Sequence, residues 1–425
     1  MRDDPPHDRS SRALRRAERR RREVRRRRAV AAALGLSLVA AAAWVALGGE
    51  RGNVKAAAAA PATRVAAKGA ATIRGRAKSP SGTRALAAGK GRPSDKARMT
   101  LREVITGDIS PKSVATSGAG YVTAQNMMYR HSVTVYDAAS LKLVKTIPDS
   151  VDLAKLGYPE YGAARGAPVE AAFASDGRYA YVSNYSMYGA GFGPEGSDSC
   201  TPSSGTDRSF LYRIDMKSLK IDRAYHVGSV PKVVAVTPDD RFVLVSNWCS
   251  WDLSVVSTKL GRVVKRIPIG PYPRGIAVAP DGSAAYVAVM GGNELVRIDL
   301  RSWQSSRLGV GSGPRAVKIE PKGRYAFVSL NAEGRVAKLD LRTGAVKAKV
   351  TTGQAPRSLE LAADGKSLFV VNYESGTVTK LRASDMSMLQ TIDACFHPIG
   401  ITYERATKRV WVACYTGSIR VYNDR

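Results

Sequence analysis

The sequence predicts an all-β fold made of seven copies of one unit, and two observations carry that prediction. Prolines at positions 231, 273, 314, 356 and 398 recur every 41 or 42 residues. Each interval holds four short runs rich in Val, Ile and Tyr that are separated by turn residues, as in GIAVAP, AAYVAV, ELVRIDL and SSRLGV. Four antiparallel strands in a repeat of about 40–45 residues are typical of one blade of a β-propeller.

Two further units complete the ring once insertions are allowed. They begin at Pro111 and Pro168, so that seven leading prolines predict seven blades. The last unit ends with the chain after three strands, whereas the segment TLREVITGDIS, residues 100–110, resembles a fourth strand. Pairing it with the last three strands would remove exposed sheet edges, which promote aggregation. We therefore expect a seven-bladed β-propeller over residues 99–425, closed by its N-terminal strand.

Three segments precede the propeller. Residues 1–28 hold 13 arginines against five acidic residues, residues 29–49 carry no charge, and residues 50–98 are rich in Ala, Gly, Lys and Arg. An uncharged stretch of this length can cross a bilayer, and a basic flank favours a cytoplasmic N-terminus. We expect a cytoplasmic tail, a transmembrane anchor or uncleaved signal, and a flexible basic linker. Cleavage at small residues such as Ala58 to Ala60 would instead release a secreted domain.

The repeats resemble those of the YVTN-type β-propeller family. The resemblance rests on YVSN ending at Asn184, LVSN ending at Asn247 and VVNY around Asn372. The asparagine is absent from the corresponding YVAV, FVSL, WVAC and YVTA. The resemblance covers about residues 100–425 and implies a bacterial extracytoplasmic propeller. It implies little about activity, because this scaffold carries unrelated functions.

Two insertions and all four cysteines fall on one face of the predicted ring. This top face carries the turns between the second and third strands of each blade and the connections between blades. The insertions, residues 149–166 and 186–209, belong to neighbouring blades, and loops of this length are commonly functional. Blade adjacency favours the disulfides Cys200–Cys249 and Cys395–Cys414 among three possible pairings. Zinc binding is the alternative, although no Cys-x-x-Cys spacing is present.

The residue after the leading proline is basic in five blades, namely Lys112, Lys232, Arg274, Arg315 and Arg357. These residues start the innermost strand, so they should ring the top mouth of the central channel. Aromatic residues and a histidine are expected nearby: Tyr185, Trp248, Tyr373, Tyr415 and His397. Cations beside aromatics suit a polyanion, a glycan or a peptide. Alternatively, Pro-Arg belongs to the repeat consensus and each cation pairs with a neighbouring carboxylate or carbonyl.

Catalytic signals are sparse. The sequence holds four histidines and no nucleophile elbow, metal-ligand spacing or phosphate loop, so we expect no cofactor and no metal site. We expect a monomeric, membrane-anchored binding module at the cell surface. Its partner would be an anionic cell-wall polymer or another surface protein; nucleic acid is less favoured. The alternatives are a secreted propeller enzyme of the lyase or quinoprotein-like kind, using His226 and His397, and a structural protein of the cell wall.

Overall fold

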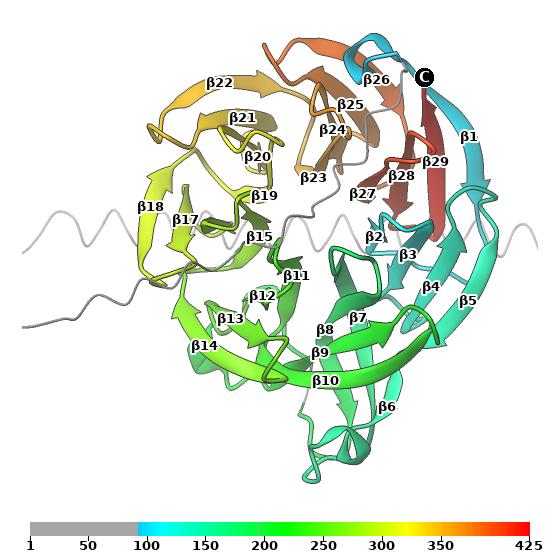
Figure 1. Ribbon diagram of the computed structural model, residues 1–425, viewed down its shortest axis with the longest axis vertical. Helices are drawn as coiled ribbons and strands as arrows, with labels where there is room; N and C mark the ends of the chain where they lie inside the picture. Colours follow the sequence, from blue (N-terminus) through cyan, green and yellow to red (C-terminus); the bar gives the residue numbers. More distant parts are fainter. Residues whose placement is uncertain (1–91, 194) are drawn as a thin grey trace, which may run out of the picture. The chain divides into compact units, whose positions relative to one another are not determined.

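The computed structural model describes residues 92–193 and 195–425, which form a ring of seven sheets (Figure 1). The predicted tail, residues 1–28, the predicted span, residues 29–49, and most of the predicted linker lie outside the described residues. Within the described part of the chain, no helix is long and apolar enough to cross a bilayer.

Each blade is an antiparallel sheet whose first strand lies innermost and whose last strand lies at the outer rim (Figure 1). Blades 1 to 3 are β2(Ser113–Thr116), β3(Tyr121–Asn126), β4(Ser132–Asp137), β5(Leu143–Pro148); β7(Ala163–Phe173), β8(Tyr179–Gly189), β9(Arg208–Asp215), β10(Lys220–Ser229); and β11(Pro231–Val236), β12(Phe242–Asn247), β13(Asp252–Ser257), β14(Arg262–Pro268). Blades 4 to 6 are β15(Pro273–Val278), β16(Ala284–Val289), β17(Glu294–Asp299), β18(Ser305–Gly309); β19(Pro314–Ile319), β20(Tyr325–Leu330), β21(Arg335–Asp340), β22(Val346–Thr351); and β23(Pro356–Leu361), β24(Ser367–Asn372), β25(Thr377–Arg382), β26(Met388–Asp393).

Blade 7 combines both ends of the propeller, as predicted. Its strands are β27(Pro398–Glu404), β28(Arg409–Cys414), β29(Ser418–Asp424) and, at the rim, β1(Met99–Ile105). β1 pairs with β29 from Met99 opposite Asp424 to Ile105 opposite Ile419. The short helix η1(Ser94–Lys96) precedes β1 and contacts blade 6, where the backbone N–H of Ser94 donates to Asp364 at 2.9 Å. The predicted closure of the ring is confirmed.

The apolar core lies between neighbouring blades rather than inside any one sheet. Tyr286 and Leu295 of blade 4, for example, pack with Val317, Val328 and Leu339 of blade 5. The alternating apolar residues of each strand point toward one neighbouring blade or the other, so both faces of the inner strands are buried. This interdigitation fixes where the start of each innermost strand lies around the channel.

Blade 2 differs from the others because its insertions are partly built into the sheet. β7 and β8 are 11 residues long, and β6(Ser150–Asp152) adds a fifth strand by pairing with β7. The extended sheet projects beyond the ring (Figure 1). The remaining insertion residues include the short helices η2(Ala154–Leu156) and η3(Pro202–Ser204). The first insertion is therefore an ordered extension of blade 2.

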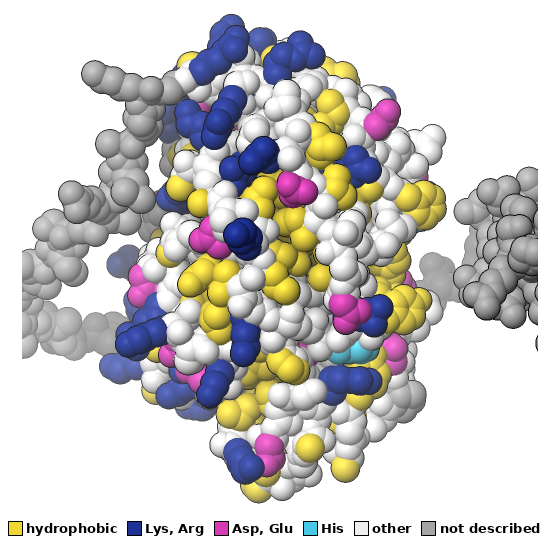
Figure 2. Space-filling model, turned by 90° about the vertical axis from the view of Figure 1, so that its right-hand side faces the viewer, with side chains coloured by type: hydrophobic (Ala, Val, Ile, Leu, Met, Phe, Trp, Pro, Cys, Tyr) yellow, Lys and Arg dark blue, Asp and Glu magenta, His cyan; other side chains and the backbone are white. Residues whose placement is uncertain are grey.

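The outer surface carries dispersed charge. On the side of blades 7 and 1, Lys and Arg side chains are scattered among apolar and acidic ones (Figure 2). The apolar residues exposed on the rim strands there are Leu101, Val104, Leu143 and Val144. This side of the propeller carries no continuous basic patch of the kind that nucleic-acid binding uses.

Candidate functional site at the channel mouth

Five basic side chains gather at the top mouth of the channel, each at the start of the innermost strand of a different blade. Lys112, Lys232, Arg274 and Arg315 are only 4–7% exposed, and Arg357 is half-buried. In blades 3 to 7 the leading proline is the first residue of the innermost strand, and in blade 1 Lys112 directly precedes β2. The structure therefore brings the predicted cations together, and it buries them.

The basic cluster, defined as these five residues, has few negative partners. Lys112 Nζ lies 4.0 Å from Glu170 Oε1, and Lys232 Nζ lies 3.7 Å from Asp198 Oδ1. Among the described residues, Arg274, Arg315 and Arg357 form no ion pair within 4.0 Å. Three of the five basic residues therefore lack the carboxylate partner that the alternative, in which each cation pairs with a neighbouring group, would give them. Only Lys112 and Lys232 have a carboxylate of the described residues within 4.0 Å.

Burial and the neighbouring positive charges lower the pKa values of the two lysines in the cluster. Burial lowers the pKa of Lys112 well below its usual value, and the positive charges of Arg274, Arg315 and Arg357 lower it further, against a smaller opposing effect of Glu170. Burial and Arg274 act in the same way on the pKa of Lys232. Removal from water and like-charge repulsion both disfavour the charged forms. The mouth thus gathers positive charge that burial and like-charge repulsion disfavour.

The predicted aromatic residues line the same mouth. Lys232 Nζ lies 4.0 Å from the ring centre of Tyr185 and 5.2 Å from that of Trp248. The guanidinium carbon of Arg357 lies 3.4 Å from the ring centre of Tyr373. These contacts stabilise cations through the negative face of the ring. They compensate part of the charge without supplying a counter-ion.

The side of the mouth formed by blades 6 and 7 presents a stack of rings. His397 lies 4.0 Å from Tyr373 and 3.7 Å from Phe396, measured between ring centres. Tyr415 meets Tyr373 at 6.3 Å, edge to face. Phe396 is 68% exposed. Its neighbour Cys395 is disulfide-bonded to Cys414, which fixes the outer end of the stack beside the basic cluster.

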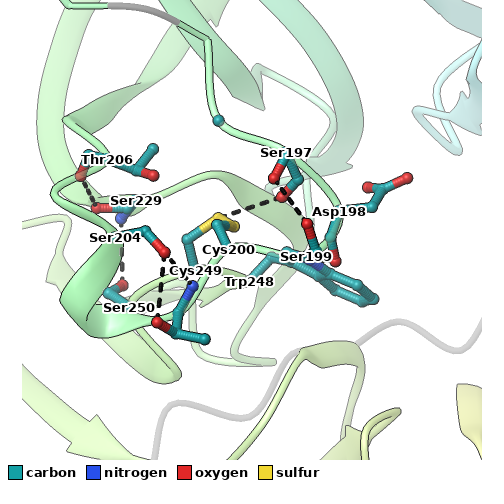
Figure 3. The surroundings of a disulfide bond; sticks show 12 residues. Ser197, Asp198, Ser199, Cys200, Ser204, Thr206, Ser229, Trp248, Cys249 and Ser250 are labelled. Carbon is teal, nitrogen blue, oxygen red and sulfur yellow. Dashed lines mark hydrogen bonds between the residues drawn. A yellow bond between two sulfur atoms is a disulfide. The ribbon is translucent and has the colours of Figure 1, made fainter. Parts of the chain in front are cut away.

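The side formed by blades 2 and 3 is covered by the second insertion. Both predicted disulfides are formed, and Cys200–Cys249 ties this insertion to blade 3 (Figure 3). The hydroxyl of Tyr185 donates to the carbonyl oxygen of Gly196 at 3.0 Å, and Trp248 Nε1 donates to that of Asp198 at 3.2 Å. Tyr185 and Trp248 are therefore wedged under the insertion, whereas Phe396 is open to solvent.

Sequence reasoning missed three residues of this site: Glu170, Asp198 and Phe396. Glu170 could have been found, because the other blades have Ser, Val, Gly or Ala at its position in the innermost strand. Asp198 lies in an insertion, where the repeat gives no register. The two histidines proposed for the enzyme alternative lie apart, since His226 stacks on Phe210 at 4.9 Å in the outermost strand of blade 2.

Below the basic cluster the channel encloses about 540 Å³. Its wall combines small apolar residues such as Ala172, Ala235 and Ala277 with polar and charged groups. Lower in the channel, Lys318 Nζ pairs with Glu360 Oε2 at 2.8 Å. A ligand group that enters the mouth from above therefore meets the cations first and a wall of mixed polar and apolar character below them.

A buried acid lies outside this site. Asp149 lies between β5, the last strand of blade 1, and β6. It is 1% exposed, and neither of its carboxylate oxygens has a hydrogen-bond partner among the described residues. Burial raises the pKa of Asp149 well above its usual value, opposed by the charge of Arg165. Asn184 Oδ1 also lacks a partner, and a Cβ on Gly166 would collide with both side chains, which places them side by side.

Asp149→Asn should therefore stabilise the protein at neutral pH. Because the pKa of Asp149 is higher in the folded than in the unfolded state, protonation of Asp149 stabilises the fold. This contribution is complete below the pKa of the unfolded state and is lost as pH rises through the pKa of the folded state. The amide avoids this loss and can donate to Asn184 Oδ1, a gain of about 1–3 kcal/mol. Thermal melts should show a higher melting temperature for the variant at pH 7 and a smaller difference at pH 4. A lower melting temperature at both pH values would contradict this account.

Two comparisons relate the chain to known proteins. Residues 313–420, in blades 5 to 7, match the family model of the cytochrome D1 heme domain, which is a β-propeller family. The chain is 27% identical over 195 residues to hydrazine synthase subunit beta of Kuenenia stuttgartiensis. That alignment covers 40% of this chain and 46% of the relative, so the chain matches less than half of that protein. Together with the seven sheets, the family match makes this chain a seven-bladed β-propeller.

Proposed function

We propose that the protein is a binding module that holds a multiply charged anion at the top mouth of its propeller. The observation that carries the proposal is the basic cluster of four buried residues and the half-buried Arg357, in which only Lys112 and Lys232 have a carboxylate of the described residues within 4.0 Å. Burying unpaired charge is unfavourable, and a ligand that brings negative charge into the mouth recovers that free energy.

The charge balance indicates the class of ligand. When all five basic residues are protonated, they face three carboxylates: Glu170, Asp198 and Glu374, the last of which acts on Arg357. The mouth then keeps about two positive charges, so a phosphate-rich or multiply carboxylated group fits better than a monovalent anion. Three of the five cations are arginines, whose planar guanidinium matches the oxygens of phosphate and carboxylate. We propose that the group belongs to an anionic cell-wall polymer or to an acidic surface protein, with the stack of Tyr373, His397 and Phe396 contacting its adjoining part.

Replacing Arg274 and Arg315 together by Gln tests the proposal. Inorganic triphosphate at constant ionic strength should raise the melting temperature of the full chain, because a ligand at 100 times its Kd stabilises by about 2.7 kcal/mol. The double variant should bind at least about tenfold more weakly. Without ligand it should be no less stable than the original protein, because like-charge repulsion is removed.

The matched control is Lys322→Gln with Lys366→Gln, two exposed lysines in the bottom turns of blades 5 and 6. This pair removes the same charge and should leave triphosphate binding unchanged. If the bottom pair weakens binding and the top pair does not, the anion site is elsewhere. If the top pair instead unfolds the domain, the arginines are structural.

We further propose that the propeller is displayed outside the cytoplasm on the span of residues 29–49. The two disulfides support this, because such bonds persist in oxidising compartments. Protease added to intact spheroplasts should degrade residues 99–425 and spare the N-terminal segment. Protection of the propeller would contradict export and would revive nucleic-acid binding for the arginine-rich tail.

A heme-binding or redox role, which the names of the matched family and relative suggest, finds less support in the residues present. Iron in heme is held by His, Cys, Met or Tyr. The wall of the channel cavity includes no His, Cys or Met among the described residues, and its Tyr403 is buried and stacked on Phe369 at 5.7 Å. All four cysteines form disulfides. The channel lining therefore does not fit a heme, and kinship with YVTN-type propellers remains our proposal.

A further inference from the structure

A short segment of the second insertion, the strap, crosses the edge of the mouth. The strap comprises residues 196–200 and is held at three points. Tyr185 donates to the carbonyl of Gly196, Trp248 donates to that of Asp198, and Cys200 is bonded to Cys249. Figure 3 shows the disulfide and Trp248 beside the strap. Tyr185, Trp248 and both cysteines are buried. The backbone of the strap is therefore fixed to blades 2 and 3.

The carboxylate of Asp198 is not fixed in the same way. Its side chain is 84% exposed and points away from the disulfide (Figure 3). Its charge raises the pKa of Lys232, Arg274, Arg315 and Arg357, although burial lowers each of these pKa values overall. It also acts on Tyr415 of blade 7. The 3.7 Å distance between Asp198 Oδ1 and Lys232 Nζ, together with these effects on five blades, places the carboxylate at the mouth.

We infer that Asp198 is a built-in counter-ion, held over the basic cluster by the strap, which the ligand displaces when it binds. The inference rests on the proposed anion site and adds its regulation and selectivity. The exposed carboxylate can turn toward solvent while the backbone stays in place, so displacement requires no unfolding. A monovalent anion that displaces the Asp198 carboxylate only replaces one negative charge by another. An anion with three or four charges gains more than Asp198 gives up, so the strap selects multivalent anions.

Asp198→Asn measures this competition, with the full chain titrated by inorganic triphosphate and by inorganic phosphate. The variant should bind triphosphate about 5–20-fold more tightly and phosphate about twofold more tightly, since repulsion scales with ligand charge. Glu195→Gln is the control, because Glu195 is an exposed carboxylate of the same insertion that forms no ion pair with the basic cluster. It should change neither affinity by more than about twofold. Weaker triphosphate binding by Asp198→Asn would overturn the inference, since Asp198 would then be a ligand contact.

Replacing Cys200 and Cys249 together by Ser tests the role of the strap. With Asp198 present, loosening the strap should tighten triphosphate binding, because the carboxylate is no longer held over the mouth. In the Asp198→Asn background the same change should have little effect. Equal effects in both backgrounds would show that the disulfide only shapes the site, and would overturn the strap's role.

Different outcomes would overturn the proposed anion site and the proposed role of Asp198. If Arg274→Gln with Arg315→Gln abolishes triphosphate binding while Asp198→Asn leaves it unchanged, the anion site stands and the counter-ion inference is wrong. If the original protein shows no triphosphate binding that depends on Arg274 and Arg315, the proposed function falls and the inference falls with it.

Discussion

Deletion of residues 99–110 should abolish cooperative folding of the propeller or destabilise it by about 5 kcal/mol or more, which is most of the stability of a typical domain. The deletion removes β1, whose whole length pairs with β29. Blade 7 would keep three strands, with β29 as an open edge. Met99, which is 3% exposed and packs with Val410 and Tyr422, would also leave the core.

The control for this deletion is the loss of residues 50–91, which precede both η1 and β1. The control keeps the contact between Ser94 and Asp364 intact and should melt close to the full chain. Circular dichroism at rising temperature measures both variants. Equal melting temperatures for the two deletions would mean that the ring does not depend on β1.

Lys380→Met should cause the second large loss, about 3–5 kcal/mol. Lys380 Nζ pairs with Asp424, and both side chains are 0% exposed. The same ammonium donates to the carbonyl oxygen of Ala97 at 2.9 Å. One side chain of β25 thereby joins blade 6 to the residues before β1 and to the end of β29. Its removal leaves the carboxylate of Asp424 buried without a partner.

Urea denaturation measures the effect, and a second variant separates its cause. Lys380→Met with Asp424→Leu removes both charges and should recover a substantial part of the loss, because a buried ion pair is often replaceable by apolar residues of similar size. If the double variant is as unstable as the single one, the loss comes from packing and not from the unpaired carboxylate.

The repeat explains why much of the fold could be predicted. The leading prolines locate the blades, because in blades 3 to 7 each is the first residue of the innermost strand. The missing fourth strand of blade 7 points to residues 100–110. Blade adjacency then selects the cysteine pairs, and both are formed. These inferences hold because they depend on strand order, which the 41- or 42-residue period determines.

The repeat could not predict which neighbouring segment covers or faces a residue of the site. The period places Lys232 and Arg274 at the mouth but cannot tell that the strap buries that side. Asp198 and Phe396 lie in connections, where the repeat gives no register. The first insertion was expected as a loop, yet Ser150–Asp152 pairs with Ala163–Arg165 as sheet, because residues on either side of the Gly- and Pro-containing turn can form a ladder.

The most direct test of the central claim is to locate an anion in the mouth. Crystals of the full chain or of its protease-resistant propeller, grown with selenate in place of sulfate, should show an anomalous selenium peak among Lys112, Lys232, Arg274, Arg315 and Arg357. The peak should disappear in Arg274→Gln with Arg315→Gln. A mouth without selenate, with selenate bound only at exposed lysines of the rim, would contradict the account.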